Sequence, residues 1–250
     1  MTDAGTCVVV GATGAIGRAV VARLVRREQR LLAVARSSDD LANLSAQLPE
    51  VSVCAADIGS DEAIATIAES LDGPVRMAVF AAGLPVRGSV STIEPGLLAV
   101  AANIKLGGLL RLVRAVDGRL EAGSRIVCFA GSLGLEPRPA EAAPGAINAG
   151  VFNLMRQLSL VYGPRGITTH TISPGPADTP RLRHIADGVA RERGCDPADV
   201  LADYAARTSL GRLPTADEVA WVVEQLLDRE ADILHGSVLY PDAGGHHGIH

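Results

Sequence analysis

The chain has 250 residues, 48% of them hydrophobic, with a formal net charge of −5 at pH 7 and a pI near 5.7. A chain of this length can bury a large core within one α/β domain. Its negative charge argues against a nucleic acid or an anionic membrane as partner, so we expect a small-molecule partner.

The sequence gives no sign of a targeting or membrane-spanning segment. No charged-then-apolar leader precedes the first apolar run, and no apolar run approaches the roughly 18 residues that a membrane-spanning helix needs. We therefore expect a soluble, cytoplasmic protein.

Seven short β-rich runs alternate with longer helical patterns. The expected strands are 6–10, 31–35, 51–55, 75–82, 124–130, 166–173 and 236–240. The expected helices are 14–27, 39–47, 61–71, 95–120, 144–162 and 216–227. The strands are nearly continuous apolar runs, as in sheets that helices cover on both faces. This alternation predicts an α/β fold, a Rossmann-like, doubly wound, seven-stranded parallel sheet in one three-layer α/β/α domain over residues 1–250.

A polar, charged stretch at 177–209 interrupts the alternation before the last helix and strand. It follows the carboxyl end of an expected strand, where open α/β sheets bind ligands. We therefore expect a helical lid over a substrate pocket. Tyr204 and His184 lie in this stretch and could reach a substrate, although packing or surface positions are the simpler interpretation.

The cysteines and histidines form no metal-binding pattern. The four cysteines, none of them in a Cys-x-x-Cys pair, are Cys7, Cys54, Cys128 and Cys195. We expect free thiols, the first three buried in strands as small hydrophobic side chains. The histidines of the glycine-rich tail are His246, His247 and His250. They have no acidic or cysteine neighbours in the sequence, so we expect a mobile tail and no bound metal.

Three glycines, Gly11, Gly14 and Gly17, follow the first expected strand and open the first expected helix. Glycine allows the backbone to turn sharply there and to approach a pyrophosphate, whose charge then lies at the helix N-terminus. In this strand-turn-helix context the triplet predicts a dinucleotide site.

With these glycines, several later motifs resemble the short-chain dehydrogenases/reductases from end to end. The matching segments are 57–58, 79–83, 174–175, 210–220 and 241–245. The chain departs from the family pattern where the usual middle glycine of the turn falls on Ala15, and where both asparagines of Asn-Asn-Ala-Gly are lost before Gly83. The resemblance implies a nicotinamide cofactor and a homo-oligomer, either a tetramer or a dimer.

The resemblance also implies which residues contact the cofactor. The turn residues are Gly11, Thr13, Gly14, Ala15, Ile16 and Gly17. The remaining contacts are Asp57 and Ile58 at the adenine, Ala82 and Gly83 after the fourth strand, and Pro174 and Gly175 under the nicotinamide.

The end of the second expected strand indicates which cofactor is bound. The position that is acidic in NAD-preferring relatives is Ala35, and Arg36, Ser37 and Ser38 follow it. A carboxylate there would bind the ribose 2′-hydroxyl and repel a 2′-phosphate, whereas a guanidinium and hydroxyls would bind that phosphate. We therefore expect NADP(H), with a solvated surface arginine as the alternative.

In the family a serine, a tyrosine, a lysine and an asparagine carry the reaction. Ungapped counting places the tyrosine position on Pro144, the lysine position on Asn148 and the serine position on Gly131, with Ser132 one residue late. Ser132 is the candidate that reaches the substrate oxygen, although a strand-end serine that satisfies the backbone fits equally well.

The asparagine position falls on Lys105, the only lysine of the chain. Lys105 and Asn148 have therefore exchanged places, which resembles the ketoreductase domains of modular polyketide synthases. We assign both to the catalytic site, and Lys105 also to the cofactor site. Chance placement, or a surface lysine that snorkels to solvent, is the alternative.

The tyrosine has no substitute at its own position, because the side chain of Pro144 neither donates nor accepts a hydrogen bond, and we expect Pro144 at the first position of its helix. We therefore expect an NADPH-dependent oxidoreductase that transfers hydride, without a tyrosine, to a quinone or an aromatic polyketide-like carbonyl in bacterial secondary metabolism, such as antibiotic biosynthesis. Lys105 would stabilise or protonate the oxyanion. The alternatives are a non-redox cyclase or dehydratase, and a non-catalytic NADPH-binding redox sensor.

Overall fold

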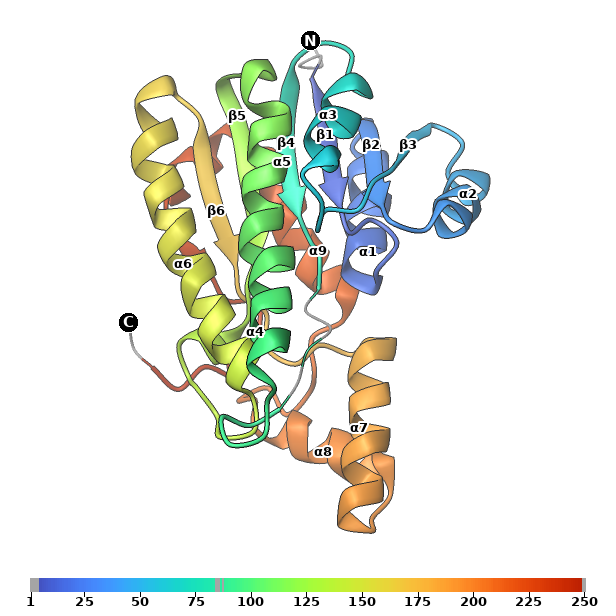
Figure 1. Cartoon of the computed structure of the whole chain (residues 1–250), viewed down its shortest axis with the longest axis vertical. Helices are drawn as coiled ribbons and strands as arrows, with labels where there is room; N and C mark the ends of the chain where they lie inside the picture. The colour runs from blue at the N-terminus through green and yellow to red at the C-terminus, as the bar shows by residue number, and fades with distance from the viewer. Residues whose placement is uncertain (1–4, 84–85, 87, 249–250) are drawn as a thin grey trace.

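The seven strands form a single parallel sheet in the order β3-β2-β1-β4-β5-β6-β7 (Figure 1). This computed structural model describes residues 5–83, 86 and 88–248. The strands are β1 (Thr6–Val10), β2 (Arg30–Ala35), β3 (Val51–Ala55), β4 (Val75–Phe80), β5 (Leu120–Phe129), β6 (Thr168–Ile172) and β7 (Val238–Leu239). The expected doubly wound sheet is confirmed, and each strand overlaps its expected range.

Helices cover both faces of the sheet, as the apolar strand pattern predicts. The α-helices are α1 (Ala15–Arg26), α2 (Ser38–Gln47), α3 (Glu62–Glu69), α4 (Pro95–Ala102), α5 (Gly108–Val116), α6 (Ala142–Tyr162), α7 (Pro180–Arg193), α8 (Pro197–Ala206) and α9 (Ala216–Gln225). Short turns are η1 (Asn103–Gly107), η2 (Asp117–Arg119), η3 (Ser132–Gly134), η4 (Gly163–Arg165) and η5 (Arg229–Leu234). One core joins the sheet to α3, α5 and α6, and a second joins its other face to α1, α2 and α9.

The expected helix 95–120 is a continuous helical segment in which the π-helical turn η1 joins α4 to α5. By length and composition one helical segment of the described residues, Pro95–Arg119, could cross a membrane, because an 18-residue window within it has a mean hydropathy of 1.6. Charged side chains interrupt this segment, so it is not an unbroken apolar run of the kind that the sequence lacks. In the structure Leu109 and Leu112 of this segment are fully buried in the core beside the sheet. The segment therefore occupies the place of a core helix.

Helix α6 begins two residues earlier than expected. Glu141 is its N-cap, and the N–H of Gly145 donates to the carbonyl oxygen of Glu141 at 2.9 Å. Pro144 is consequently the third helical residue and not the first. It still costs no helical hydrogen bond, because the first four N–H groups of a helix have no acceptor within it.

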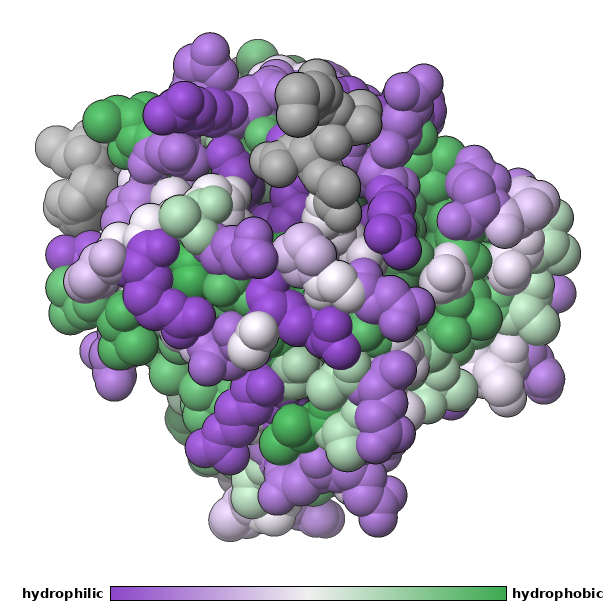
Figure 2. Space-filling view, turned by 90° about the horizontal axis from the view of Figure 1, so that it is seen from above, coloured by the Kyte–Doolittle hydropathy of each residue, from purple (hydrophilic) through white to green (hydrophobic). Residues whose placement is uncertain are grey.

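The stretch expected to form a lid is a helical pair, α7 and α8, below the carboxyl ends of the strands in Figure 1. Ala186, Ala190 and Val200 are buried between the two helices. The opposite end of the molecule carries mostly hydrophilic side chains with small apolar patches between them (Figure 2). The first turn of α7 supplies Arg181 to the lining of both cavities described below.

Candidate active site

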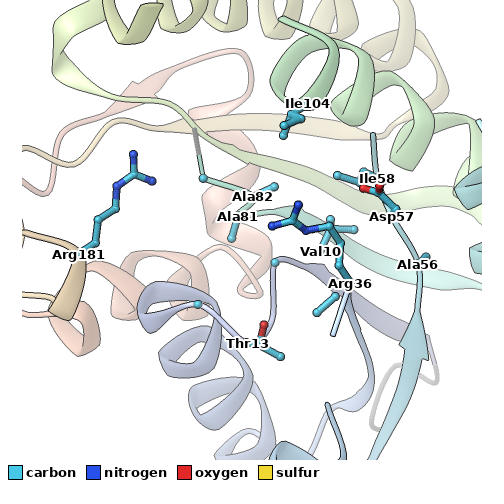
Figure 3. A pocket seen from close by; sticks show the side chains of 14 residues that line it. Val10, Thr13, Arg36, Ala56, Asp57, Ile58, Ala81, Ala82, Ile104 and Arg181 are labelled. Atoms are coloured by element: carbon cyan, nitrogen blue, oxygen red, sulfur yellow. The ribbon is translucent and has the colours of Figure 1, made fainter. Parts of the chain in front are cut away.

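A cavity of about 310 Å³ lies where the strand order reverses, between β1 and β4. Open α/β sheets bind their ligands at this point, outside the carboxyl ends of the strands. Its described lining consists of Val10, Gly11, Thr13, Gly14, Ala35, Arg36, Ala56, Asp57, Ile58, Ala81, Ala82, Gly83, Ile104 and Arg181. Arg36 and Arg181 approach it from opposite sides (Figure 3).

The glycine turn provides the close backbone approach that the sequence predicts. Gly11 has φ of +82°, a conformation that other residues adopt only under strain. A Cβ atom on Gly17 would collide with the carbonyl oxygen of Gly11. Gly14 is the N-cap of α1 and has no side chain to cap the helix, so the first turn of α1 is available to a phosphate.

Eight residues expected at the cofactor line this first cavity: Gly11, Thr13, Gly14, Arg36, Asp57, Ile58, Ala82 and Gly83. Pro174 and Gly175 line a second cavity instead. Five expected residues line neither of these two cavities: Ala15, Ile16, Gly17, Ser37 and Lys105.

Arg36 follows β2 directly and is exposed at the wall of the first cavity. It forms no hydrogen bond or ion pair with the residues that the structure describes, and Ala35 beside it carries no charge. Ser37 caps α2, where its hydroxyl accepts a hydrogen bond from the N–H of Asp40 at 3.1 Å. Of the two expected phosphate ligands, Arg36 therefore faces the cavity and Ser37 also has a structural role.

A second cavity, of about 220 Å³, lies between the end of β5, α6 and α7. Its described lining consists of Gly131, Ser132, Leu133, Arg138, Glu141, Pro144, Pro174, Gly175, Pro176, Arg181, Leu182, Ile185 and Tyr204. Three expected positions, Gly131, Ser132 and Pro144, thus meet around one space. The Ser132 hydroxyl forms no hydrogen bond with another residue in the described part of the chain.

Lys105 lies behind the wall of the first cavity. Its Nζ donates to the carbonyl oxygen of Ala82 at 2.9 Å and lies 5.5 Å from the ring centroid of Phe80, and the residue is buried. Burial lowers the pKa of Lys105 below its ordinary value; the Cys128 thiol opposes this shift and the positive charge of Arg181 adds to it. Lys105 therefore contacts the backbone that borders the cavity.

Asn148 is buried in α6 beside Gly131. Its amide nitrogen donates to the carbonyl oxygen of Pro144 at 2.8 Å. No hydrogen bond joins Asn148 to Lys105 among the described residues. The two side chains come from different helical segments, and neither lines the first or the second cavity.

Some lining residues were not expected from the sequence, among them Arg138, Glu141, Arg181 and Leu182. Arg181 follows a Thr-Pro pair, an N-terminal helix signal that was available in the sequence. Tyr204 lines the second cavity, with the guanidinium of Arg207 5.3 Å from its ring centroid. His184 is exposed and lines neither cavity.

The histidines of the tail lie against the loop after β5. His246 and His247 approach the carboxylate of Glu136 at 3.1 and 3.3 Å, and the ring of His246 stacks on Tyr240. The N–H of His247 donates to the same carboxylate, which holds the pKa of Glu136 below its usual value. No group of three or more His, Cys, Asp or Glu side chains suited to a metal occurs in the described residues, and His250 lies outside them.

A glycine turn beside a cavity, at the point where the strand order of a parallel sheet reverses, defines a dinucleotide-binding protein of the Rossmann type. A family model described as enoyl-(acyl carrier protein) reductase matches residues 11–246. The chain therefore belongs to this family, which is part of the short-chain dehydrogenases/reductases.

Individual relatives resemble the chain over most of its length. An uncharacterised short-chain type dehydrogenase/reductase, y4vI of Sinorhizobium fredii, is 28% identical over 97% of this chain, which spans only 43% of that protein. Short-chain reductase protein NovJ of Streptomyces niveus is 25% identical, with 98% of this chain and 95% of NovJ covered. A variant of the actinorhodin polyketide ketoreductase, crystallised with NADPH, has a TM-score of 0.91 at 24% identity, with 99% of both chains covered.

Proposed function

We propose that this protein is a cytoplasmic NADPH-dependent reductase that transfers hydride to a quinone or an aromatic polyketide-like carbonyl in bacterial secondary metabolism, without a catalytic tyrosine. One observation carries the proposal. Pro144, which ungapped counting places on the family's tyrosine position, lines the second cavity beside Ser132, Pro174 and Gly175.

The residues of the first cavity suit NADPH. The backbone around Gly11 and Gly17 leaves the space that a Cβ atom would fill, and Arg36 stands where a 2′-phosphate is recognised. Ala35 places no carboxylate there to repel that phosphate. When bound, NADPH supplies the hydride. The ketoreductase crystallised with NADPH supports this choice of cofactor.

The substrate class follows from the missing proton donor. A plain ketone becomes an alkoxide on reduction and depends on a general acid, which is worth about 10²- to 10⁴-fold in rate. A quinone becomes a phenolate, whose conjugate acid has a pKa of about 10, as tyrosine has. Such an anion can form without a strong acid beside it, so this class of substrate is compatible with proline at position 144.

Ser132, Lys105 and Asn148 have different parts in this proposal. Ser132 faces the second cavity and donates a hydrogen bond to the substrate oxygen. Lys105 holds the cavity wall through Ala82, and its lowered pKa makes it a stronger acid than an ordinary lysine. Asn148 shapes the floor of the second cavity under Gly131.

Hydride transfer tests the proposal directly. Purified protein is mixed with one equivalent of NADPH and a naphthoquinone or anthraquinone, and the loss of NADPH absorbance is followed in a single turnover. We expect transfer to the quinone and little to a plain cyclic ketone. NADPH binding without transfer to any quinone would contradict the proposal and favour a non-redox enzyme or a sensor.

We also infer a homo-oligomer. Large apolar side chains are exposed on two helices of the same face, Leu97 and Val100 on α4 and Leu160 and Val161 on α6. Light scattering coupled to size exclusion is expected to give a dimer or a tetramer. A monomer at micromolar concentration would contradict this inference.

A further inference from the structure

Arg181 connects the two cavities. Of the described residues, it is the only one that lines both of them. It comes from the first turn of α7, and in Figure 3 its side chain extends toward the end of the first cavity opposite Arg36. A group at this junction lies where the reacting ends of a cofactor and a substrate would meet.

The backbone that carries Arg181 is anchored to the body of the protein. The N–H of Asp178 donates to the carbonyl oxygen of Pro214 at 2.9 Å, and Asp178 forms a bridge with Thr215. Thr179 caps α7 by accepting from the N–H of Leu182 at 3.3 Å, and Leu182 is buried. The guanidinium is therefore presented from a fixed base, as electrostatic catalysis requires.

The guanidinium lies against the segment that follows β4. A Cβ atom on Gly83 would be 2.7 Å from Nη1 of Arg181. Lys105 also reaches this segment, because its Nζ donates to the carbonyl oxygen of Ala82. Two basic side chains therefore lie beside Ala82 and Gly83: Arg181, which lines the first cavity, and Lys105, which is buried and does not line it.

The two basic groups differ in what they can contribute. An arginine side chain stays protonated under all physiological conditions, whereas burial lowers the pKa of Lys105. Among the described residues that line the second cavity, the charged side chains are Arg138, Arg181 and Glu141, whose charges sum to a positive value. A permanent cation that cannot give up its proton suits an oxygen that becomes a phenolate.

We propose that Arg181 is a catalytic residue whose guanidinium binds the substrate oxygen that becomes negative on hydride addition, in place of the family's tyrosine. This rests on the proposed function. The hydride adds to the conjugated system of the acceptor, and an electron pair moves onto the carbonyl oxygen, leaving NADP⁺ and a phenolate or enolate beside Arg181. A proton from solvent or Lys105 then neutralises that oxygen.

The first experiment tests, without turnover, whether the guanidinium of Arg181 stabilises a negatively charged oxygen on a bound ligand. The probe is 1,2-dihydroxyanthraquinone, which changes colour when a hydroxyl ionises, titrated from acid to base in the presence of protein and NADP⁺. An opposite charge in contact lowers a pKa by about 1–3 units, and we expect a lowering of this size for the bound probe. Arg181→Gln is expected to abolish the lowering and Arg181→Lys to retain part of it.

Arg183→Gln is the matched control. Arg183 lies on the same helix, is exposed, and pairs with Asp178 at 3.0 Å without lining either cavity. It is expected to leave the probe's titration unchanged. An unchanged titration in Arg181→Gln, or an equal change in Arg183→Gln, would overturn the proposal.

The second experiment separates the substrate oxygen from the cofactor diphosphate, the other anion that this junction could receive. NADPH affinity is measured by fluorescence titration, and the hydride-transfer rate constant in a single turnover at saturating NADPH. For Arg181→Gln we expect a rate constant at least about 100-fold lower, as for loss of one oxyanion donor, with NADPH affinity within about 3-fold of wild type. A large loss of affinity with an unchanged rate constant would assign Arg181 to the cofactor.

The failure of this proposal can be distinguished from failure of the proposed function. The wild-type protein could reduce no quinone and still lower the pKa of the bound probe through Arg181. That result would support the anion site at Arg181 and contradict the proposed reductase activity. If quinones are reduced and Arg181→Gln matches wild type in both experiments, the proposed reductase activity is supported and Arg181 is not a catalytic residue.

Discussion

The side-chain amide of Asn148 donates to the carbonyl oxygen of Pro144, one turn earlier in α6, at 2.8 Å. This contact holds the amide against the backbone of Gly131, so that a Cβ atom there would lie 3.0 Å from Nδ2. Positions 131 and 148, which ungapped counting aligns with the family's serine and lysine, are therefore in close contact in this chain. A side chain at position 131 needs a smaller neighbour at position 148.

This fit can be measured with a double-mutant cycle. We expect Gly131→Ala to lower the free energy of unfolding by about 1 kcal/mol, the low end of the cost of overpacking. In an Asn148→Ala background the same change should cost much less, because the contact is gone. Urea unfolding of the four proteins gives the coupling, and additive effects would show that the two positions are independent.

Restoring tyrosine at position 144 should extend the reaction to plain ketones. Pro144 is the third residue of α6 and faces the second cavity, so Pro144→Tyr removes no helical hydrogen bond and adds a proton donor. We expect at least about a 10-fold rise in kcat/KM for a cyclic ketone, short of the full effect because position 148 is not lysine. Pro144→Phe supplies the ring without the hydroxyl, and an equal gain in that variant would exclude proton donation.

The fold, and which residues meet around the first cavity, could be predicted because their signals are local. Apolar runs specify buried parallel strands, and Gly11 and Gly17 are needed where the backbone itself is close-packed. The expectation that Arg36 lies at the first cavity follows from its position directly after a strand. These features depend on residues that are near each other in the sequence.

The substrate end depends on how distant elements dock, which the sequence does not encode locally. Arg181 meets Gly83 from a helix almost a hundred positions later, and Tyr204 reaches the second cavity from α8. Lys105 was assigned by counting along a helix, but the π-helical turn that carries it departs from the regular period. Counting therefore gave its position and not its contact with Ala82.

Arg36 should set the preference for NADPH over NADH. A hydrogen bond to a charged group contributes about 1.5–3 kcal/mol, so Arg36→Gln is expected to reduce the ratio of NADPH to NADH affinity by about 10- to 100-fold. Arg30→Gln is a suitable control, because Arg30 is an exposed arginine at the other end of β2. Both affinities are measured by fluorescence titration. An unchanged ratio in Arg36→Gln would make Arg36 an ordinary surface residue.

Tyr204 should bind an aromatic substrate through its ring. It lines the second cavity from α8, and Arg207 lies over its ring. Aromatic stacking contributes about 0.5–1.5 kcal/mol, so Tyr204→Leu is expected to raise KM for a quinone by about 2- to 10-fold with little change in kcat. Tyr204→Phe should behave as wild type. If Tyr204→Phe instead lowers kcat, the hydroxyl takes part in proton transfer and α8 supplies the missing acid.

His170 should make the protein sensitive to mild acid. It is fully buried in β6, its Nε2 lies 2.9 Å from Oγ1 of Thr168, and burial first, with the charge of Arg125, lowers its pKa to about 4 from 6.5. The unfolded chain therefore binds a proton at higher pH than the folded chain. The contribution of this difference in pKa to the stability of the folded state is complete above pH 6.5 and is lost as the pH falls toward 4.

Between about pH 7.5 and 5 this difference corresponds to about 2 kcal/mol of unfolding free energy. We expect His170→Gln, which cannot titrate, to be less stable at neutral pH but to lose about 2 kcal/mol less than wild type over this interval. Urea unfolding at the two pH values measures both effects. His184→Asn removes an exposed histidine of α7 and should keep the wild-type pH dependence, whereas an unaltered slope in His170→Gln would place the acid sensitivity on other groups.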